Sequence, residues 1–225
     1  VTLYNDSLFL NGLYSGAGGE SHRALIPAAI MSKISMDNPS HDANAIRRHS
    51  FNVRTGVWTE TIDSEVGFIT HRIYVHAKYI RVLVSDIHAT RKYGGILNLA
   101  YSDMEDNVDI DFGTKQEYRS DWKIQGRTRV PEAGSTTSQV SVFWMKPLKQ
   151  ISLNTLEEVR EIMIMAVDKS DAAAQNDFDN AKSIFQNRDQ GPDVLLREHT
   201  DTWASIWAQG MIEVESQELA VAKAV

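Results

Sequence analysis

The segment THRIYVHAKYIRVLVS, residues 70–85, contains two neighbouring stretches in which apolar and polar side chains alternate. The apolar positions of the two stretches are Ile73, Val75, Ile80, Val82 and Val84. The positions between them hold Arg72, Tyr74, His76 and Arg81. Because successive residues of an extended chain point to opposite faces, a period of two predicts two half-buried β-strands.

The same alternation recurs in VSVFWM (140–145) and VREIMIMAV (159–167). Turn signals separate the predicted strands, at Thr55-Gly56, Gly94-Gly95, Gly113, Gly126 and Gly134. Many short strands without helices between them favour two packed antiparallel sheets. We therefore expect a mainly β protein in which residues 1–168 form an antiparallel β-sandwich domain.

The last part of the chain changes to a helical pattern, and we expect residues 169–225 to form a helical linker. Ser170 is a suitable N-cap for a helix over 170–187, which carries Phe178, Ala181 and Phe185 at helical spacing. A second helix is predicted over 191–210, with Leu195, His199, Trp203 and Ile206 on one face. A third begins at 216–225, where Ser216 is the cap and Glu218 lies in the first turn. The chain ends inside that pattern, so we expect more protein to follow.

Composition restricts the possible partners. The chain has 225 residues, 42% of them hydrophobic, and a formal net charge of −7. This charge disfavours nucleic acid and anionic membranes and suits a neutral ligand. The sequence has no cysteine, which excludes disulfides, thiolate catalysis and cysteine-based zinc sites. We expect a cytoplasmic protein without a membrane span, while an extracellular or lysosomal location stays open.

A glycine-rich stretch, YSGAGGESHRALIP (14–27), resembles no standard nucleotide or nucleophile motif. Glu20 stands where a phosphate-binding loop needs lysine, the third glycine of a dinucleotide fingerprint is missing, and no G-x-S-x-G is present. We interpret Gly16, Gly18 and Gly19 as residues of a tight surface loop that needs positive φ angles. His22 and Arg23, which follow, suit a polar ligand.

No other part of the sequence completes a chemical site. The acidic run 102–113 fits no register of an EF-hand, so we expect a solvated strand edge or hairpin. The histidines are scattered, and His71 and His76 should point to opposite faces of a strand, so no metal site is predicted. His199 is expected to be buried beside Trp203 and Trp207. Glu157 and Glu158 are adjacent and poorly placed for an acid pair. We therefore predict no catalytic residue and no cofactor.

Three segments resemble glycoside hydrolase family 65: GLYSGAGGESHRALIP (12–27), residues 70–85, and HTDTWASIWAQGMIEVES (199–216). The resemblance implies a galactose-mutarotase-like supersandwich, a helical linker, and then an (α/α)₆ barrel that carries the catalytic acids. It implies that this chain ends where the barrel starts and that further strands precede Val1. The first motif is closest to family members that remove glucose from a glucosyl-galactosyl-hydroxylysine.

Site roles and partners follow from this resemblance. It implies a substrate-proximal loop of Gly16, Gly18, Gly19, Glu20, His22 and Arg23, and interdomain packing by His199, Trp203 and Trp207. Arg23 could equally pair with an acid at the domain interface. The implied partners are the barrel of the same polypeptide and a carbohydrate at the domain interface, with a homodimer left open. A free-standing carbohydrate-binding or structural sandwich, and the same domain of a phosphorylase or trehalase, remain alternatives.

Overall fold

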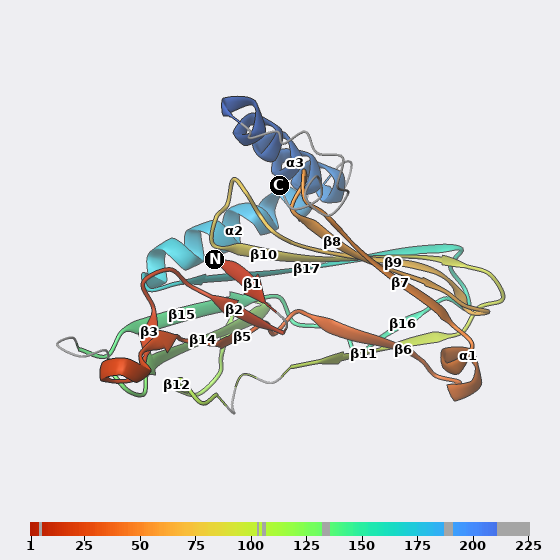
Figure 1. The fold of residues 1–225 in the computed structure, drawn as a ribbon. Helices are drawn as coiled ribbons and strands as arrows, with labels where there is room; N and C mark the ends of the chain where they lie inside the picture. The colour runs from red at the N-terminus through yellow and green to blue at the C-terminus, as the bar shows by residue number, and fades with distance from the viewer. Residues whose placement is uncertain (5, 103, 105–106, 132–135, 187–190, 211–225) are drawn as a thin grey trace.

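The computed structural model describes residues 1–4, 6–102, 104, 107–131, 136–186 and 191–210. Antiparallel β-sheets make up most of this part of the chain, and two long helices follow at its C-terminal end. Figure 1 shows these helices, α2 and α3, on the outer side of the central strands, with a second layer of strands on the other side. The predicted fold class, mainly β with C-terminal helices, is confirmed.

The largest sheet has nine strands, in the order β12-β14-β15-β17-β10-β9-β8-β7, with β13 paired to β14. All the pairings in it are antiparallel. Its strands are β7 (Ile46–Asn52), β8 (Val57–Asp63), β9 (Gly67–Val75), β10 (Val82–Arg91), β12 (Ile110–Phe112), β13 (Gln116–Tyr118), β14 (Asp121–Thr128), β15 (Gln139–Trp144) and β17 (Glu158–Asp168).

The second layer consists of shorter sheets, ordered β1-β2-β5, β16-β11-β6 and β3-β4. Their strands are β1 (Thr2–Tyr4), β2 (Ser7–Phe9), β3 (Tyr14–Ser15), β4 (His22–Arg23), β5 (Ile26–Pro27), β6 (Ser32–Met36), β11 (Ile96–Tyr101) and β16 (Gln150–Ser152). A short helix α1 (Pro39–Ala43) and a 3₁₀ turn η1 (Gly18–Glu20) complete this part of the chain.

The predicted strands form, but the central ones are buried on both faces rather than on one. On β17, Met163 packs into the core between the two layers, whereas Ile164 packs under the helices. The same division separates Ile73 from Tyr74 on β9, and all four side chains are at most 2% exposed. The expectation of half-buried strands was therefore wrong here, because α2 covers the outer face with Phe178 and Ala181.

Two local predictions also fail. Ile80 and Arg81 belong to the turn before β10, where Ile80 is 57% exposed and Arg81 binds Asp168. Gly126 lies inside β14 and not in a turn. A Cβ at Gly126 would approach the side chain of Phe112 to 2.7 Å, so the glycine serves close strand packing. Gly134 lies outside the described residues.

The two helices agree closely with the sequence pattern. Helix α2 spans Asp171–Gln186, and the Ser170 hydroxyl accepts a hydrogen bond from the Ala173 amide at 3.3 Å, as expected of an N-cap. Helix α3 spans Gly191–Gln209. Its predicted apolar face is buried at its start and emerges towards its end, where Ile206 is 46% exposed.

The third predicted helix, with Ser216 and Glu218, lies outside the described residues. The division into domains at residue 168 stays a prediction. Among the described helices, none combines the length and the apolar character that crossing a membrane requires.

Candidate functional site

The glycine-rich stretch forms a hairpin, in which β3 pairs with β4 through Tyr14 with Arg23 and Ser15 with His22. Gly16 and Gly18 have φ angles of 101° and 60°, as predicted for a tight loop. A Cβ at Gly16 would lie 2.5 Å from the Glu20 carbonyl oxygen, so this position requires glycine. Gly19, in contrast, has no positive φ and open space around it, so its predicted conformational need is absent.

His22 fastens this hairpin to the rest of the domain. Its Nε2 lies 2.8 Å from a carboxylate oxygen of Asp109, and its Nδ1 lies 3.0 Å from the Glu20 carbonyl oxygen. Both partners only accept hydrogen bonds, so the two contacts are satisfied together when both ring nitrogens carry protons. The Glu20 carbonyl, together with Asp109, accordingly raises the pKa of His22.

The partner of His22 belongs to the acidic run, which includes the expected strand edge, since β12 ends the large sheet and Asp111 is exposed, but also contains buried polar residues. Asp109 is 3% exposed and also accepts a hydrogen bond from the Leu25 amide at 2.8 Å. Asn107, 7% exposed, donates to the Leu25 carbonyl, and its own carbonyl accepts from Arg129. Asn107 and Asp109 therefore bind the segment that contains the hairpin and are not solvated. Among the described residues, no three or more histidine or acidic side chains gather in a way that could hold a metal ion.

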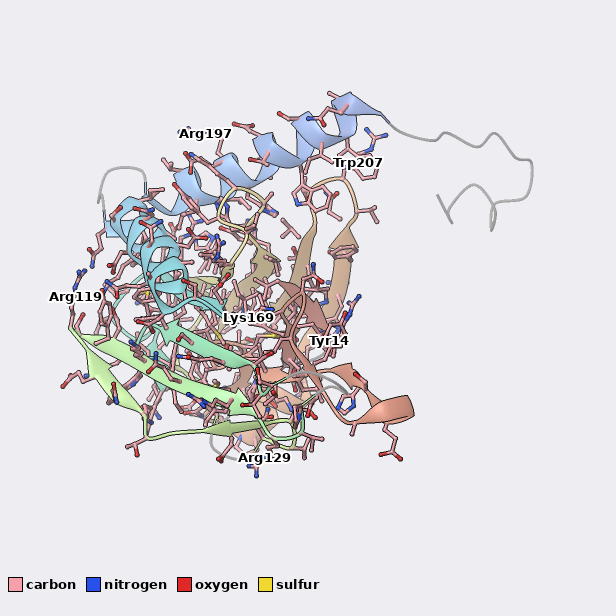
Figure 2. All side chains as sticks on the ribbon, turned by 90° about the vertical axis from the view of Figure 1, so that its left-hand side faces the viewer. Tyr14, Arg119, Arg129, Lys169, Arg197 and Trp207 are labelled. Carbon is pink, nitrogen blue, oxygen red and sulfur yellow. The ribbon has the colours of Figure 1, made fainter. Side chains whose placement is uncertain are left out.

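Two other charged side chains of the hairpin, Glu20 at its tip and Arg23 opposite Tyr14 at its base, differ from His22. Glu20 and Arg23 are both exposed, and neither forms an ion pair with another described residue. Figure 2 shows the hairpin beyond Tyr14 projecting from the body of the protein. Arg23 is therefore available to a ligand or to another surface, while His22 is committed to Asp109.

His199 of α3 is fully buried, as predicted, and a second histidine faces it. The Nδ1 of His199 accepts a hydrogen bond from the Ala77 amide at 3.1 Å, and its ring packs against Tyr74 at 4.5 Å between centroids. The Nδ1 of His76 accepts hydrogen bonds from the amides of Lys78 and Tyr79. Its Nε2 lies 3.1 Å from the Leu195 carbonyl oxygen and donates to it.

Both of these rings are therefore neutral, with the proton on Nε2. A proton on Nδ1 would face an N–H donor. In His199 it would break the bond from Ala77 that attaches α3 to the turn between β9 and β10. In His76 it would break the bonds from Lys78 and Tyr79 within that turn. Burial lowers the pKa of His76 to about 4. Burial also lowers the pKa of His199, and the Thr55 backbone opposes this shift without reversing it.

Trp203 and Trp207 clamp the turn between β7 and β8, with their ring centroids 6.4 Å apart. The Trp207 indole donates to the Arg54 carbonyl at 2.9 Å, and Figure 2 shows this side chain near the end of α3. Gly56 lies so close to Trp203 that a Cβ would meet its Nε1 at 2.7 Å. The sequence predicted the turn at Gly56 and the helix that carries both tryptophans, but it did not predict that the two would be in contact. Packing of these residues against another domain stays a prediction.

Sequence reasoning missed a pocket of about 940 Å³ between the strand layers and the end of α3. Its lining includes Trp58, Glu60, His71 and Trp203, but no residue of 16–23. The hairpin therefore lies apart from the pocket. Trp203, in contrast, both contacts the turn between β7 and β8 and forms part of the pocket wall. The alternation of Arg47, His49 and Phe51 on β7 is a signal that could have indicated the pocket's polar side.

Comparison with known proteins yields relatives although no family model matches the chain. The chain is 25% identical over 219 residues to the protein-glucosylgalactosylhydroxylysine glucosidase of Gallus gallus, covering 95% of this chain and 30% of that enzyme. The enzyme of Mus musculus is 25% identical over 92% of this chain, and that of Danio rerio is 23% identical over 93%. The chain spans about a third of the length of these relatives.

A comparison of structures adds a likeness in the fold. A human-microbiome protein assigned as a kojibiose phosphorylase superposes with a TM-score of 0.59 and 10% identity, over 88% of this chain and 32% of that protein. This likeness concerns the fold alone. The chain is thus homologous to the N-terminal region of the protein-glucosylgalactosylhydroxylysine glucosidases and shares the fold found in a phosphorylase of glycoside hydrolase family 65.

Proposed function

We propose that this chain is the N-terminal accessory domain of an α-glucoside-acting enzyme that removes glucose from glucosyl-galactosyl-hydroxylysine. The similarity to glucosidases of that name, over nearly the whole chain but only 30% of their length, carries the proposal. The three glucosidases favour this activity over a disaccharide phosphorylase, because the phosphorylase likeness rests on 10% identity.

The described carboxylates support placing the chemistry elsewhere in the enzyme. Inverting cleavage needs one carboxylic acid and one carboxylate on opposite sides of the scissile bond. Every buried acid described here is paired with a basic side chain: Glu60 with Arg47, Asp86 with Arg160, Asp109 with His22, Asp121 with Lys182 and Asp177 with Arg81. Burial raises the pKa of Glu161, but this is a single group.

Arg23 is the residue of this domain that we assign to the substrate or to the rim of the pocket in the catalytic barrel. It is an exposed cation on a hairpin whose base is fixed by His22, so its position is defined while its charge is free. A guanidinium that donates to sugar hydroxyls in a desolvated site contributes about 1.5 to 3 kcal/mol.

The test is a glucose-release assay on the complete open reading frame, with glucosyl-galactosyl-hydroxylysine in the presence and absence of phosphate. Phosphate-independent release supports the proposal, and glucose 1-phosphate as the product replaces it by the phosphorylase. The 225-residue chain alone should release no glucose. Activity in the isolated chain contradicts the assignment of the chemistry to another domain.

Substitution of Arg23 sharpens the assay. Arg23→Ala should lower kcat/KM by about ten- to a hundredfold with little change in melting temperature. Arg48→Ala, which removes an exposed arginine of β7 that forms no ion pair with another described residue, is the matched control and should leave both unchanged. If Arg23→Ala unfolds the enzyme while activity per folded molecule stays intact, Arg23 serves the domain interface instead.

A further inference from the structure

The pocket of about 940 Å³ has a floor and walls from distant parts of the chain. Its floor is the inner face of β7, β8 and β9, where His49 pairs with Glu60 and Glu60 pairs with His71 across neighbouring strands. Its walls include residues of β1, β6 and α3. Figure 1 shows β6 under the layer of β7, β8 and β9, with α3 above that layer. Its volume lies within the range of about 300 to 1,000 Å³ that is usual for small-molecule sites.

Some polar atoms on the floor of the pocket can still form hydrogen bonds. One oxygen of Glu60, Oε1, accepts from Arg47 at 3.1 Å and lies 3.2 Å from the Nε2 of His49. The other oxygen, Oε2, has no hydrogen bond to another described residue, although Glu60 is only 8% exposed.

His71 adds a second unused group to the floor. It is 1% exposed, and its Nε2 lies 2.8 Å from the Ser85 hydroxyl. Its Nδ1 has no partner among the described residues. Burial lowers the pKa of His71 to about 4, so this ring is neutral at physiological pH. Buried polar atoms are normally paired, so the floor of the pocket is short of polar partners.

Aromatic rings lie beside these polar groups. Phe51 and Trp58 are directly opposite each other on β7 and β8, and both line the pocket. Trp58 is half-buried, with the His49 ring stacked on it at 5.5 Å, whereas Phe51 is 61% exposed. A large aromatic side chain exposed at the edge of a pocket offers a face for a ligand with an apolar side.

The charges of the lining are balanced. Asp6 lies 3.8 Å from Lys33, and Glu60 is paired with Arg47, so the charged side chains that line the pocket form two neutral pairs. A neutral pocket gives no electrostatic preference for an anion or a cation. A ligand with hydroxyl groups on its rim and C–H groups on its faces matches both the polar floor and the aromatic edge.

We propose that this pocket binds a neutral saccharide, with one sugar ring on Phe51 and hydroxyl groups bound to the row of His49, Glu60 and His71. The site lies within the described chain, and the inference does not depend on the proposed enzyme activity.

The test is an NMR titration of the labelled 225-residue chain with an α-linked glucosyl-galactose disaccharide, with glycerol as a polyol that lacks a ring. The Trp58 indole resonance should shift saturably with the disaccharide and not with glycerol. Phe51→Ala should weaken binding about tenfold, and Phe51→Tyr, which keeps the ring, should retain it.

Phe68→Ala is the matched control, because Phe68 is an exposed phenylalanine of the same sheet that does not line the pocket. It should leave the affinity within about twofold of the parent value. The proposal is overturned if the disaccharide causes no saturable shift, if glycerol causes the same shift, or if the two alanine variants bind equally. Glucose release by the complete enzyme does not enter this test, so either proposal can fail alone.

Discussion

Two regions of the molecule use histidine in opposite ways. In the glycine-rich hairpin, His22 faces two acceptors, so its cationic form holds the hairpin to Asp109. Under α3, His199 and His76 accept backbone N–H groups through Nδ1, so their neutral forms hold the helix and the turn beneath it. The same side chain therefore fastens one element when it is charged and another when it is neutral. The hydrogen-bonding character of the partner atoms, and not the residue type, determines which form is required.

The largest effect should come from removing a histidine under α3. His199→Ala takes away the acceptor of the Ala77 amide and the ring packed on Tyr74, and it leaves a cavity at a fully buried position. We expect the free energy of unfolding, measured by urea denaturation, to fall by about 3 to 4 kcal/mol.

His88→Ala is the matched control, because it removes a histidine whose partner, Glu158, lies at the surface. It should cost less than about 1 kcal/mol. Equal losses for His199→Ala and His88→Ala would show that the buried contacts of α3 contribute little.

Acid should loosen the α3 attachment in the wild-type protein. The pKa of His76 is lowered from 6.5 to about 4 in the folded state, and that of His199 is lowered too. A lowered pKa means that the unfolded state binds protons first, so this stability is present above pH 6.5 and is lost as the pH falls towards 4. The loss should be about 2 to 3 kcal/mol for His76.

Denaturation curves between these pH values measure this loss, and His76→Asn is the control. The Asn side-chain oxygen can replace the Nδ1 acceptor but does not titrate. The variant should be less stable than the wild type at neutral pH and should depend less on pH. A wild-type stability that stays constant over the interval contradicts the neutral-ring arrangement.

Glycines permit a direct comparison of the two regions. Gly56 and Gly18 have nearly the same φ, 63° and 60°, but a Cβ meets Trp203 only at Gly56 and meets nothing within 4 Å at Gly18. Gly18→Ala should therefore cost about 1 kcal/mol for backbone strain alone. Gly56→Ala should cost about 1 kcal/mol more, because the Trp203 ring must move. The difference in stability between the two variants, measured by melting curves, isolates the tryptophan contact. An equal loss of stability in both would show that the Trp203 ring moves aside at no cost.

The sequence was sufficient to predict individual strands and helices. It was insufficient to predict which segments pack against them. Alternation located β9 and β17, and the Ser170 cap located α2, because these signals depend on neighbouring residues. The second buried face of the central strands was missed because α2 and α3 cover it, and their docking depends on contacts between distant segments. The partner of His22 is 87 positions away in the sequence, and no local pattern connects them. The pocket was missed for the same reason, since its lining residues come from several distant segments.

The smallest effect should be the response of the hairpin to base. His22 gains two acceptors on folding and its pKa is raised, so its contribution is present below pH 6.5 and is lost as the pH rises through the folded-state pKa. Because its side chain is 54% exposed, solvent screens the pair with Asp109, and the contribution should be only a few tenths of a kcal/mol.

NMR titration of the ring protons tests the comparison, because His22 should titrate above 6.5 while His76 stays neutral down to about 5. The protection factor of the Leu25 amide, which donates to Asp109, should fall slightly over the same rise in pH. If His22 titrates below 6.5, the hairpin is held by Asp109 and Leu25 without the charge, and the contrast between the two regions is lost.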